Sequence, residues 1–242
     1  MQQYFVSGTI RLQEPVLFND QQLHHIQTVL RMKERGQIRL VDETSQVFIA
    51  ELHHQDGCMV AIPIRKIEAV TNRISITLAL ALIKGERWDY ALQKCSELGV
   101  ESIQPLITSR CVVKLKASDL QKKRQRWNRI TMEACEQCQR ADLVTVNEPC
   151  AISQLSALSA NVKLLAYENA DATGEHIVSF VKNHPNVRSI LVAIGPEGGF
   201  TASEVKQFHE QGFQNISLGR RILRAETAAL SAVNLLSLLY EN

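Results

Sequence analysis

The sequence has 242 residues, of which 45% are hydrophobic and 21% are charged, a composition typical of a folded protein with a buried core. The formal net charge is only +2, so any surface for nucleic acid has to be a local patch. We find no signal peptide and no apolar run of membrane-spanning length, and the scattered cysteines indicate reduced thiols, so we expect a cytoplasmic protein.

The first 70 residues predict a small domain that combines one helix with several short strands. Asn19 can cap a helix over residues 21–32, where apolar residues recur at helical spacing. Short strands are expected over residues 37–42, 46–54 and 58–64. This pattern favours a small β-barrel module over residues 1–70, followed by a linker from Pro63 to Asn72.

From residue 73 onward, strands and helices alternate. The apolar, strand-like runs cover residues 74–83, 100–107, 162–167, 189–195 and 215–219. The helix-like runs between and after them cover residues 86–98, 117–139, 173–183, 202–211 and 225–240. Such alternation predicts parallel strands joined by crossover helices, so residues 73–242 are expected to form an α/β domain.

Two glycine-marked turns follow the last two predicted strands. The first is "GPEGG" at residues 195–199, and the second is "LGRRILR" at residues 218–224. A single glycine after a strand usually marks only a tight turn, but ligands bind beyond the carboxyl ends of parallel strands. If the two strands are neighbours, both turns line one pocket, where glycine lets the backbone approach a ligand closely. We therefore interpret the two turns as a binding site.

These turns do not match the common phosphate-binding or nucleophile motifs. They contain no G-x-G-x-x-G, no G-x-x-x-x-G-K-[ST] and no G-x-S-x-G. Pro196 removes one amide donor and stiffens the first turn, which suits a shaped cleft for a neutral or cationic ligand. Elsewhere, Cys135 and Cys138 form a C-x-x-C without a second pair at zinc-site spacing, so we expect no metal.

Basic residues concentrate between positions 110 and 129. Arg110, Lys122, Lys123 and Arg126 belong to this run, in which Asp119 is the single acid. Such a run is usually a solvated helix face, but its nearly unbroken sign in a near-neutral protein favours a face that binds RNA phosphates. A second basic patch, which includes Arg31, is expected in the first 70 residues to contact RNA as well.

Longer motifs surround these features. "IGPEGGF" and "LGRRILRAETA" stand near the C-terminus, "KGERWDYALQKCSELGV" follows the first strand of the larger domain, and "ITMEACEQCQR" ends the basic helix. Together with "HHIQTVLRM" and "IRLVD", they resemble the 16S ribosomal RNA (uracil-N3)-methyltransferase family of the SPOUT superfamily. Where the family pattern has a Gly-Arg pair and then Pro-x-Val, this chain has Gln139-Arg140 and "ADLVTV".

The resemblance implies a SPOUT-type, trefoil-knotted parallel-sheet domain preceded by a small PUA-like β-barrel. In such a domain the segment from about Leu218 threads through an earlier loop, which is rare among proteins, and S-adenosylmethionine binds in the knotted crevice. By resemblance, the residues that contact S-adenosylmethionine are Gly195, Pro196, Glu197, Gly198, Gly199, Leu218, Gly219, Ile222, Leu223 and Thr227.

The implied reaction is methylation of uracil N3 in the 16S ribosomal RNA of the small ribosomal subunit. N3 carries a proton at neutral pH, so the site has to remove this proton or stabilise the resulting anion. Arg221 and Arg224 are candidate anion stabilisers, and Glu226 or Glu197 is a candidate base. Each of the four can also be explained as a structural ion pair or a helix cap, since acids are favoured in the first turn of a helix.

Two alternatives to this function stay open, as does the oligomeric state. The alternatives are a SPOUT enzyme that methylates a ribose 2′-hydroxyl and a non-catalytic RNA-binding factor for ribosome assembly. The resemblance implies a homodimer, and the predicted last helix, residues 225–240, is apolar on more than one face. A helix buried within its own chain would explain the same pattern.

Overall fold

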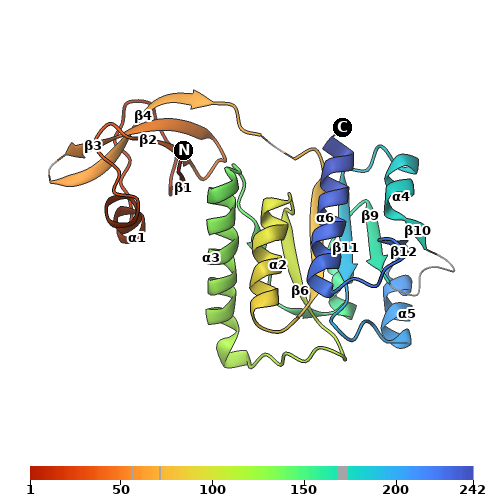
Figure 1. Ribbon diagram of the computed structural model, residues 1–242. Coiled ribbons are helices and arrows are strands. Elements are labelled where there is room, and N and C mark those ends of the chain that lie inside the picture. Colours follow the sequence, from red (N-terminus) through yellow and green to blue (C-terminus); the bar gives the residue numbers. More distant parts are fainter. Residues whose placement is uncertain (56, 71, 168–173, 242) are drawn as a thin grey trace. The chain divides into compact units, whose positions relative to one another are not determined.

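The computed structural model describes residues 1–55, 57–70, 72–167 and 174–241 (Figure 1). The chain forms two compact units. The smaller unit comprises Met1–Thr71 together with Cys135–Asp142, and the larger comprises Asn72–Ala134 together with Leu143–Asn242.

The smaller unit is built on a four-stranded sheet of order β1-β2-β3-β4. Its strands are β1 (Gln3–Phe5), β2 (Gln37–Val41), β3 (Val47–Gln55) and β4 (Cys58–Ile67). β1 pairs in parallel with β2, whereas β2, β3 and β4 form antiparallel hairpins. Asp42 closes the first hairpin, because its carboxylate accepts hydrogen bonds from the backbone of Thr44 and Gln46.

A short helical segment covers this sheet. Asn19 caps α1 (Asp20–His24) through a capping box with Gln22, and a π-helical turn, η1 (His25–Val29), continues it. The capping residue is the one expected from the sequence. The core beneath includes the fully buried side chains of Ile26, Ile38 and Leu40.

The predicted linker is wrong at its start. β4 continues through Pro63 to Ile67, so the first half of the expected linker is strand. Proline fits there because β4 is the outer strand of the sheet, and the pairing with β3 shifts register between Ile49 and Ala50, opposite Pro63. Edge positions and bulges are the places where a strand tolerates a residue without an N–H.

The segment Cys135–Asp142 carries the departure from the family pattern. Gln139 has a φ of 63°, in the left-handed region that favours glycine. Its side-chain amide donates to the carbonyl of Met1 at 3.1 Å, and its carbonyl accepts from Arg39. The side chain of Gln3 donates to the carbonyl of Arg140 at 2.6 Å. A non-glycine residue is therefore held in a conformation that glycine, the residue expected here from the resemblance, adopts without strain.

The larger unit contains an all-parallel sheet of order β10-β12-β9-β11-β5-β6-β7, with β8 also pairing with β6. The strands are β5 (Ser75–Ala81), β6 (Ser102–Ile107), β7 (Thr145–Val146), β8 (Cys150–Ala151), β9 (Val162–Ala166), β10 (Glu175–His176), β11 (Ser189–Ile194) and β12 (Phe213–Ser217). The helices are α2 (Glu86–Glu97), α3 (Leu120–Cys138), α4 (Ile177–Asn183), α5 (Ala202–Glu210) and α6 (Ala225–Glu241), with short 3-10 turns η2 (Ala117–Asp119) and η3 (Ile152–Ala157). The predicted fold class, a parallel α/β domain preceded by a small β domain, is confirmed.

Helices cover both faces of this sheet. α6 lies between α2 and α4 and packs on β5 and β11 (Figure 1). The other face packs against α5 and η3 through a cluster that includes Ala79, Leu191, Phe208 and Phe213. Successive strand residues point to opposite faces, so burial on both sides explains why the strands are apolar throughout rather than alternating.

Two predicted helices begin later than expected. The predicted 117–139 helix starts as a 3-10 turn, and α3 proper begins at Leu120. In the 173–183 segment, Glu175 and His176 pair with β12 as a two-residue strand, so α4 begins only at Ile177. Thr173, the first residue of that predicted helix, lies outside the described residues.

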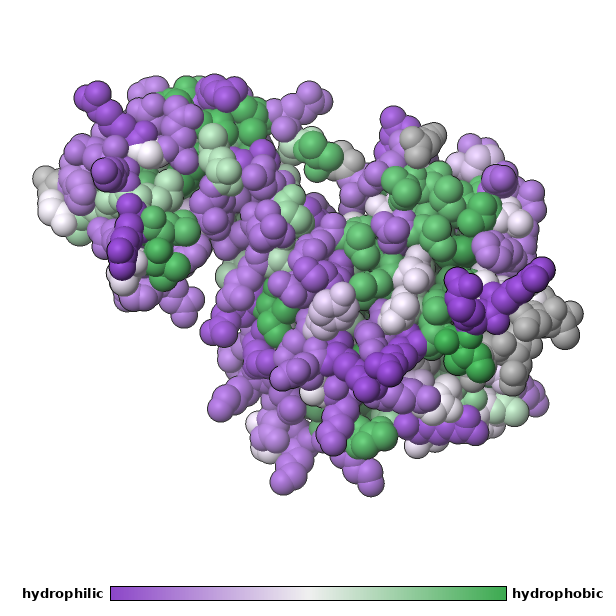
Figure 2. Space-filling view, viewed as in Figure 1, coloured by the Kyte–Doolittle hydropathy of each residue, from purple (hydrophilic) through white to green (hydrophobic). Residues whose placement is uncertain are grey.

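α6 keeps part of its apolar surface exposed. Ala229 and Ala232 are fully buried within the chain, whereas Leu238 is 51% exposed. Figure 2 shows apolar side chains gathered over this helix. The small alanines thus serve packing inside the unit, and the exposed apolar character comes from the opposite side of the helix.

Candidate active site

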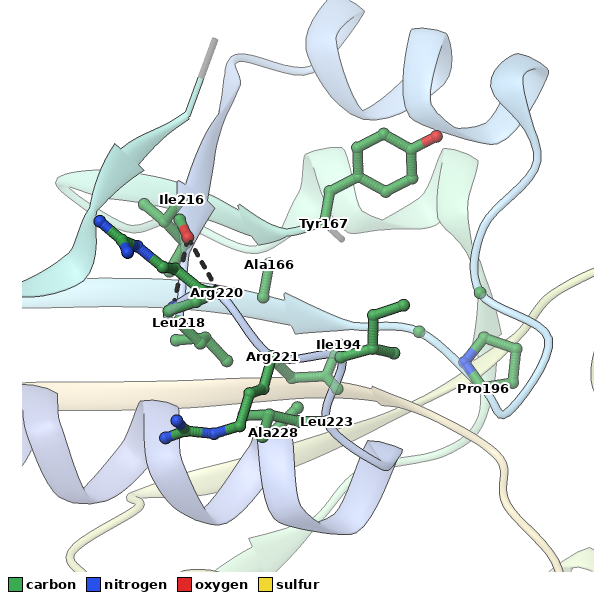
Figure 3. Close-up of a pocket in the computed structure, with 15 residues that line it drawn as sticks. Ala166, Tyr167, Ile194, Pro196, Ile216, Leu218, Arg220, Arg221, Leu223 and Ala228 are labelled. Atoms are coloured by element: carbon green, nitrogen blue, oxygen red, sulfur yellow. Dashed lines mark hydrogen bonds between the residues drawn. The ribbon is translucent and has the colours of Figure 1, made fainter. Parts of the chain in front are cut away.

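A cavity of about 340 Å³ opens beyond the carboxyl ends of β9, β11 and β12 (Figure 3). β9 contributes the first part of its wall, the turn after β11 the second, and the segment after β12 most of the rest. The lining residues are Ala166, Tyr167, Ile194, Gly195, Pro196, Gly199, Ile216, Ser217, Leu218, Gly219, Arg220, Arg221, Ile222, Leu223 and Ala228.

The two glycine turns meet although their strands are not neighbours. β9 lies between β11 and β12 in the sheet, so both turns flank the end of β9, where Ala166 and Tyr167 add to the wall. α6 packs on β5 and β11. In the sheet order, these two strands lie on one side of β9 and β12 lies on the other. The segment 218–224 therefore crosses the strand ends beside the first glycine turn before α6 begins.

The wall is formed largely by backbone at its glycines. Gly199 and Gly219 have φ angles of 66° and 117°, values that side-chain-bearing residues rarely adopt. At Gly195, an added Cβ would lie 3.2 Å from the ring of Phe200. The hydroxyl of Ser217 accepts a hydrogen bond from the N–H of Gly219 at 3.2 Å, drawn as a dashed line in Figure 3, and this bond fixes the second turn.

Side chains give the cavity an apolar floor and a cationic rim. Figure 3 shows Ala166, Ile194, Leu223 and Ala228 gathered in the middle of the site. Arg220 and Arg221 come from the segment between β12 and α6, and both are exposed. A flat apolar group with polar ends fits such a lining.

Seven of the predicted S-adenosylmethionine contacts line the cavity: Gly195, Pro196, Gly199, Leu218, Gly219, Ile222 and Leu223. Glu197, Gly198 and Thr227 do not line it. Gly198 faces away, because an added Cβ there would meet the side chain of Arg110. Tyr167 also lines the cavity and was not among the predicted contacts, although it ends a predicted strand, the place where ligand contacts are expected.

Arg87, which was not among the predicted site residues, pairs with two predicted catalytic acids. Its guanidinium lies 3.9 Å from Glu197 Oε1 and 3.8 Å from Glu226 Oε1. Glu226 is only 9% exposed, and its Oε2 has no hydrogen-bond partner within the described part of the chain. This geometry places both acids on Arg87 rather than in the cavity wall. Of the two predicted anion stabilisers, Arg221 lines the cavity and Arg224 does not.

Glu204 holds the far end of the first glycine turn. The turn leads into α5, whose capping residue Thr201 donates its N–H to Glu204 Oε2 at 2.8 Å. Glu204 Oε1 accepts from the N–H and hydroxyl of Ser109 at 2.8 and 3.0 Å. Burial raises the pKa of Glu204, but these hydrogen bonds outweigh burial and hold the pKa below its ordinary value.

The basic run on α3 is only partly paired. Arg126 donates to Asp89 at 2.9 Å, and Arg124 forms an ion pair with Glu148. Among the described residues, no side-chain hydrogen bond or ion pair involves Lys122 or Lys123. In the smaller unit, Arg31 is also exposed.

The described ranges also bear on metal binding and membrane insertion. No group of three or more His, Cys, Asp or Glu side chains there could hold a metal ion. No helix in that part of the chain is long and apolar enough to cross a membrane.

Comparison with known proteins decides the family. The RNA methyltransferase domain family matches residues 70–237. The Bacillus subtilis protein named ribosomal RNA small subunit methyltransferase E is 34% identical to this chain, and the match covers 98% of this chain and 96% of that protein. The chain belongs to the ribosomal RNA small subunit methyltransferase E family. The Synechocystis protein of the same name is 33% identical over 93% of this chain and 74% of its own length.

Solved structures of relatives agree with this membership. A ribosomal RNA small subunit methyltransferase E from Neisseria gonorrhoeae, bound to S-adenosyl methionine, has a TM-score of 0.88 and 30% identity, covering 99% of this chain and 98% of its own. A Legionella pneumophila protein in complex with the bound cofactor SAM has a TM-score of 0.87 and 30% identity, covering 97% and 96% of the two chains. The family resemblance seen in the motifs is confirmed.

Proposed function

We propose that this chain transfers a methyl group from S-adenosylmethionine to N3 of a uridine in 16S ribosomal RNA. The observation that carries the proposal is the cavity between the two glycine turns, in a chain whose family membership extends over nearly its whole length. Relatives that superpose on nearly the whole chain were solved with S-adenosylmethionine.

The lining fits S-adenosylmethionine. Gly195, Gly199 and Gly219 present backbone without side chains, so a ligand can approach the chain closely at these positions. The apolar floor suits the faces of an adenine ring, and the polar rim suits the ribose and amino-acid portions. When bound, S-adenosylmethionine supplies a methyl group already activated on a sulfonium, so no metal is needed for the transfer.

The reacting nitrogen of uracil sets the task of the protein side chains. N3 must lose its proton, and the resulting anion, spread over O2 and O4, needs positive charge nearby. Arg221 is the candidate that supplies this charge, because it lines the cavity. Glu226 and Glu197 are engaged with Arg87, which favours structural roles for both acids.

Ribosomal RNA binding is assigned to cations outside the cavity. Lys122 and Lys123 on α3 carry charges with no counter-charge among the described residues, and Arg31 is exposed on the smaller unit. Arg126 already has Asp89 as its partner and contributes less. An enzyme with this substrate works in the cytoplasm, where ribosomes are assembled.

We also propose the knot and the homodimer that the resemblance implies. The crossing of segment 218–224 beside the first glycine turn supports the proposed threading. Two separate exposed apolar side chains, the half-exposed Leu238 near the end of α6 and the 85% exposed Ile222 at the cavity rim, would each gain from cover by a second copy. Light scattering that gives about twice the 27.2 kDa chain mass would support the dimer, and a fully active monomer would refute it.

Nucleoside analysis tests the reaction itself. Small ribosomal subunits from a deletion strain are incubated with the protein and S-adenosylmethionine, and the RNA is digested and analysed by mass spectrometry. We expect 3-methyluridine, which also stops reverse transcriptase because the methyl group occupies the base-pairing edge. A 2′-O-methylated nucleoside would identify the alternative enzyme, and S-adenosylmethionine binding without any RNA product would leave the assembly-factor alternative.

A further inference from the structure

Arg110, which the sequence grouped with RNA-binding residues, contacts the first glycine turn in the structure. Its Nη1 donates to the carbonyl of Gly198 at 2.7 Å. The side chain also lies against the turn along its length, because a Cβ added at Gly198 would be 3.2 Å from Arg110 Cβ and 3.3 Å from Cδ. The glycine at position 198 thus leaves room for the arginine rather than for a ligand.

The segment that carries Arg110 is itself fixed. Ser109, its neighbour, donates both its N–H and its hydroxyl to Glu204 at the start of α5. The N–H of Cys111 donates to the carbonyl of Thr108 at 3.2 Å, which closes a turn around Arg110 just after β6. The arginine therefore reaches the glycine turn from a rigid base.

The bond acts on the peptide that forms the cavity wall. The carbonyl of Gly198 belongs to the same peptide group as the N–H of Gly199, a residue that lines the cavity with a φ of 66°. Two adjacent glycines have wide conformational freedom, and within the turn this peptide is held at its N–H side, where Gly199 donates to the carbonyl of Pro196 at 2.9 Å. Its carbonyl side is held by a contact from another segment. Arg110 supplies that contact from the side away from the cavity.

We propose that Arg110 is a positioning residue for S-adenosylmethionine, which holds the Gly198–Gly199 peptide in its binding orientation. The inference rests on the proposed function, since it requires S-adenosylmethionine to occupy the cavity. A charge-assisted bond to a carbonyl is already in place without RNA, which separates Arg110 from Lys122 and Lys123. Lysine is not an equivalent here, because its single ammonium lacks the planar fork of guanidinium.

Calorimetry without RNA tests the proposal. We expect Arg110→Ala to bind S-adenosylmethionine about tenfold more weakly than the wild type, equivalent to about 1.4 kcal/mol, and Arg110→Lys to be weakened as well. The KM for S-adenosylmethionine should rise while kcat at saturating concentration stays within about twofold, the split that a loss of cofactor binding produces. The control is Lys206→Ala on α5. The Lys206 side chain is 79% exposed and does not line the cavity, so this variant should bind S-adenosylmethionine like the wild type.

A change on the other side of the contact gives independent evidence. Gly198→Ala adds a Cβ that displaces the Arg110 side chain, so it should weaken binding to a similar degree. The double variant Arg110→Ala with Gly198→Ala should be weakened much less than the product of the two single effects, because both changes break one contact.

The measurements separate a failure of the Arg110 role from a failure of the proposed function. Arg110→Ala or Arg110→Lys that binds S-adenosylmethionine like the wild type, but binds RNA more weakly, would overturn the positioning role and make Arg110 a phosphate ligand. Wild-type protein that does not bind S-adenosylmethionine would overturn the proposed function and the inference with it. If Arg110→Ala does not fold, Arg110→Lys and Gly198→Ala carry the test.

Discussion

Nε of Arg87 lies 3.8 Å from Oε1 of Glu226, and this contact gives a nearly buried carboxylate its counter-charge. Arg87 stands in the first turn of α2 and Glu226 in the first turn of α6, so the pair joins the starts of two neighbouring helices. Breaking a buried pair costs more than the pair itself contributes, because one charge is left without a partner.

Arg87→Met should therefore destabilise the protein. We expect the free energy of unfolding to fall by about 1 to 2 kcal/mol, less than for a fully buried pair because Arg87 is half exposed. Adding Glu226→Gln should restore part of the loss by removing the unpaired charge. Urea denaturation measures both. Lys206→Met, which removes an exposed cation, is the control and should change stability by less than about 0.5 kcal/mol. Equal effects of Arg87→Met and Lys206→Met would show that the Arg87 contact contributes nothing.

The two candidate anion stabilisers should separate in activity. Arg221 lines the cavity and Arg224 does not, although the two are three residues apart. We expect Arg221→Gln to lower kcat by about 100-fold or more, as when a charge-stabilising group is removed from an active site. Arg224→Gln should lower kcat by less than about tenfold. Steady-state methylation of small subunits at saturating S-adenosylmethionine provides the comparison. Equal losses would contradict the assignment of Arg221.

Glu204 should make stability depend on pH. Its pKa in the folded state is lowered, so its ionised form contributes stability above the unfolded pKa of about 4.3, and that contribution is lost as the pH falls through the folded pKa. We expect Glu204→Gln to lower Tm at pH 7 and the difference from the wild type to shrink below about pH 4. Glu210→Gln, a 63% exposed site on the same helix, should show no such trend. A constant difference across the pH range would exclude the linkage.

Gln139→Gly should stabilise the smaller unit. A non-glycine residue in the left-handed region costs about 1 kcal/mol, and the exposed hydrogen bond that Gln139 makes with Met1 is worth less. We expect Tm to rise by about 2 to 4 °C in a thermal melt. Gln139→Ala removes the same hydrogen bond without gaining the freedom of glycine, so it should not raise Tm. A rise for both variants would place the gain elsewhere than in the backbone.

RNA binding should be sensitive to salt through Lys122 and Lys123. Each lysine that binds an RNA phosphate displaces a counterion, so replacing both with Gln should make the slope of log affinity against log salt shallower by about 0.7 to 0.9 per phosphate that is no longer bound. Filter binding to 16S ribosomal RNA across a salt series measures the slope. Arg126→Gln should change it less, because Asp89 already neutralises that charge. An unchanged slope in the double variant would remove α3 from the RNA-binding surface.

Local sequence signals predicted the parts of the fold that depend on neighbours in the chain. Apolar runs marked β5, β9, β11 and β12, and glycines marked the turns after β11 and β12. The cap at Asn19 was predictable because capping depends on residues three positions apart. The turns were correctly expected to share one cavity, but the expected reason, adjacent strands, was wrong, because β9 intervenes.

Contacts between distant segments were not predictable in this way. Arg87 lies 110 positions before Glu197 in the sequence, and no periodicity relates them; only the parallel sheet brings α2 beside the first glycine turn. The same holds for Arg110 and Gly198, where a cation that seemed part of a basic run makes a specific bond. Charge counting treats all cations in a run alike, whereas the fold gives each a different neighbour.

The late position of β12 and segment 218–224 in the chain has a consequence for how the protein matures during synthesis. The first glycine turn leaves the ribosome before β12 and the segment 218–224, yet most of the cavity wall comes from those later residues. A nascent chain that ends just after the first glycine turn holds 6 of the 15 lining residues and nothing to face them. S-adenosylmethionine can then stabilise only chains in which the late segment has reached its place across the strand ends, so cofactor binding selects completed molecules over partly assembled ones.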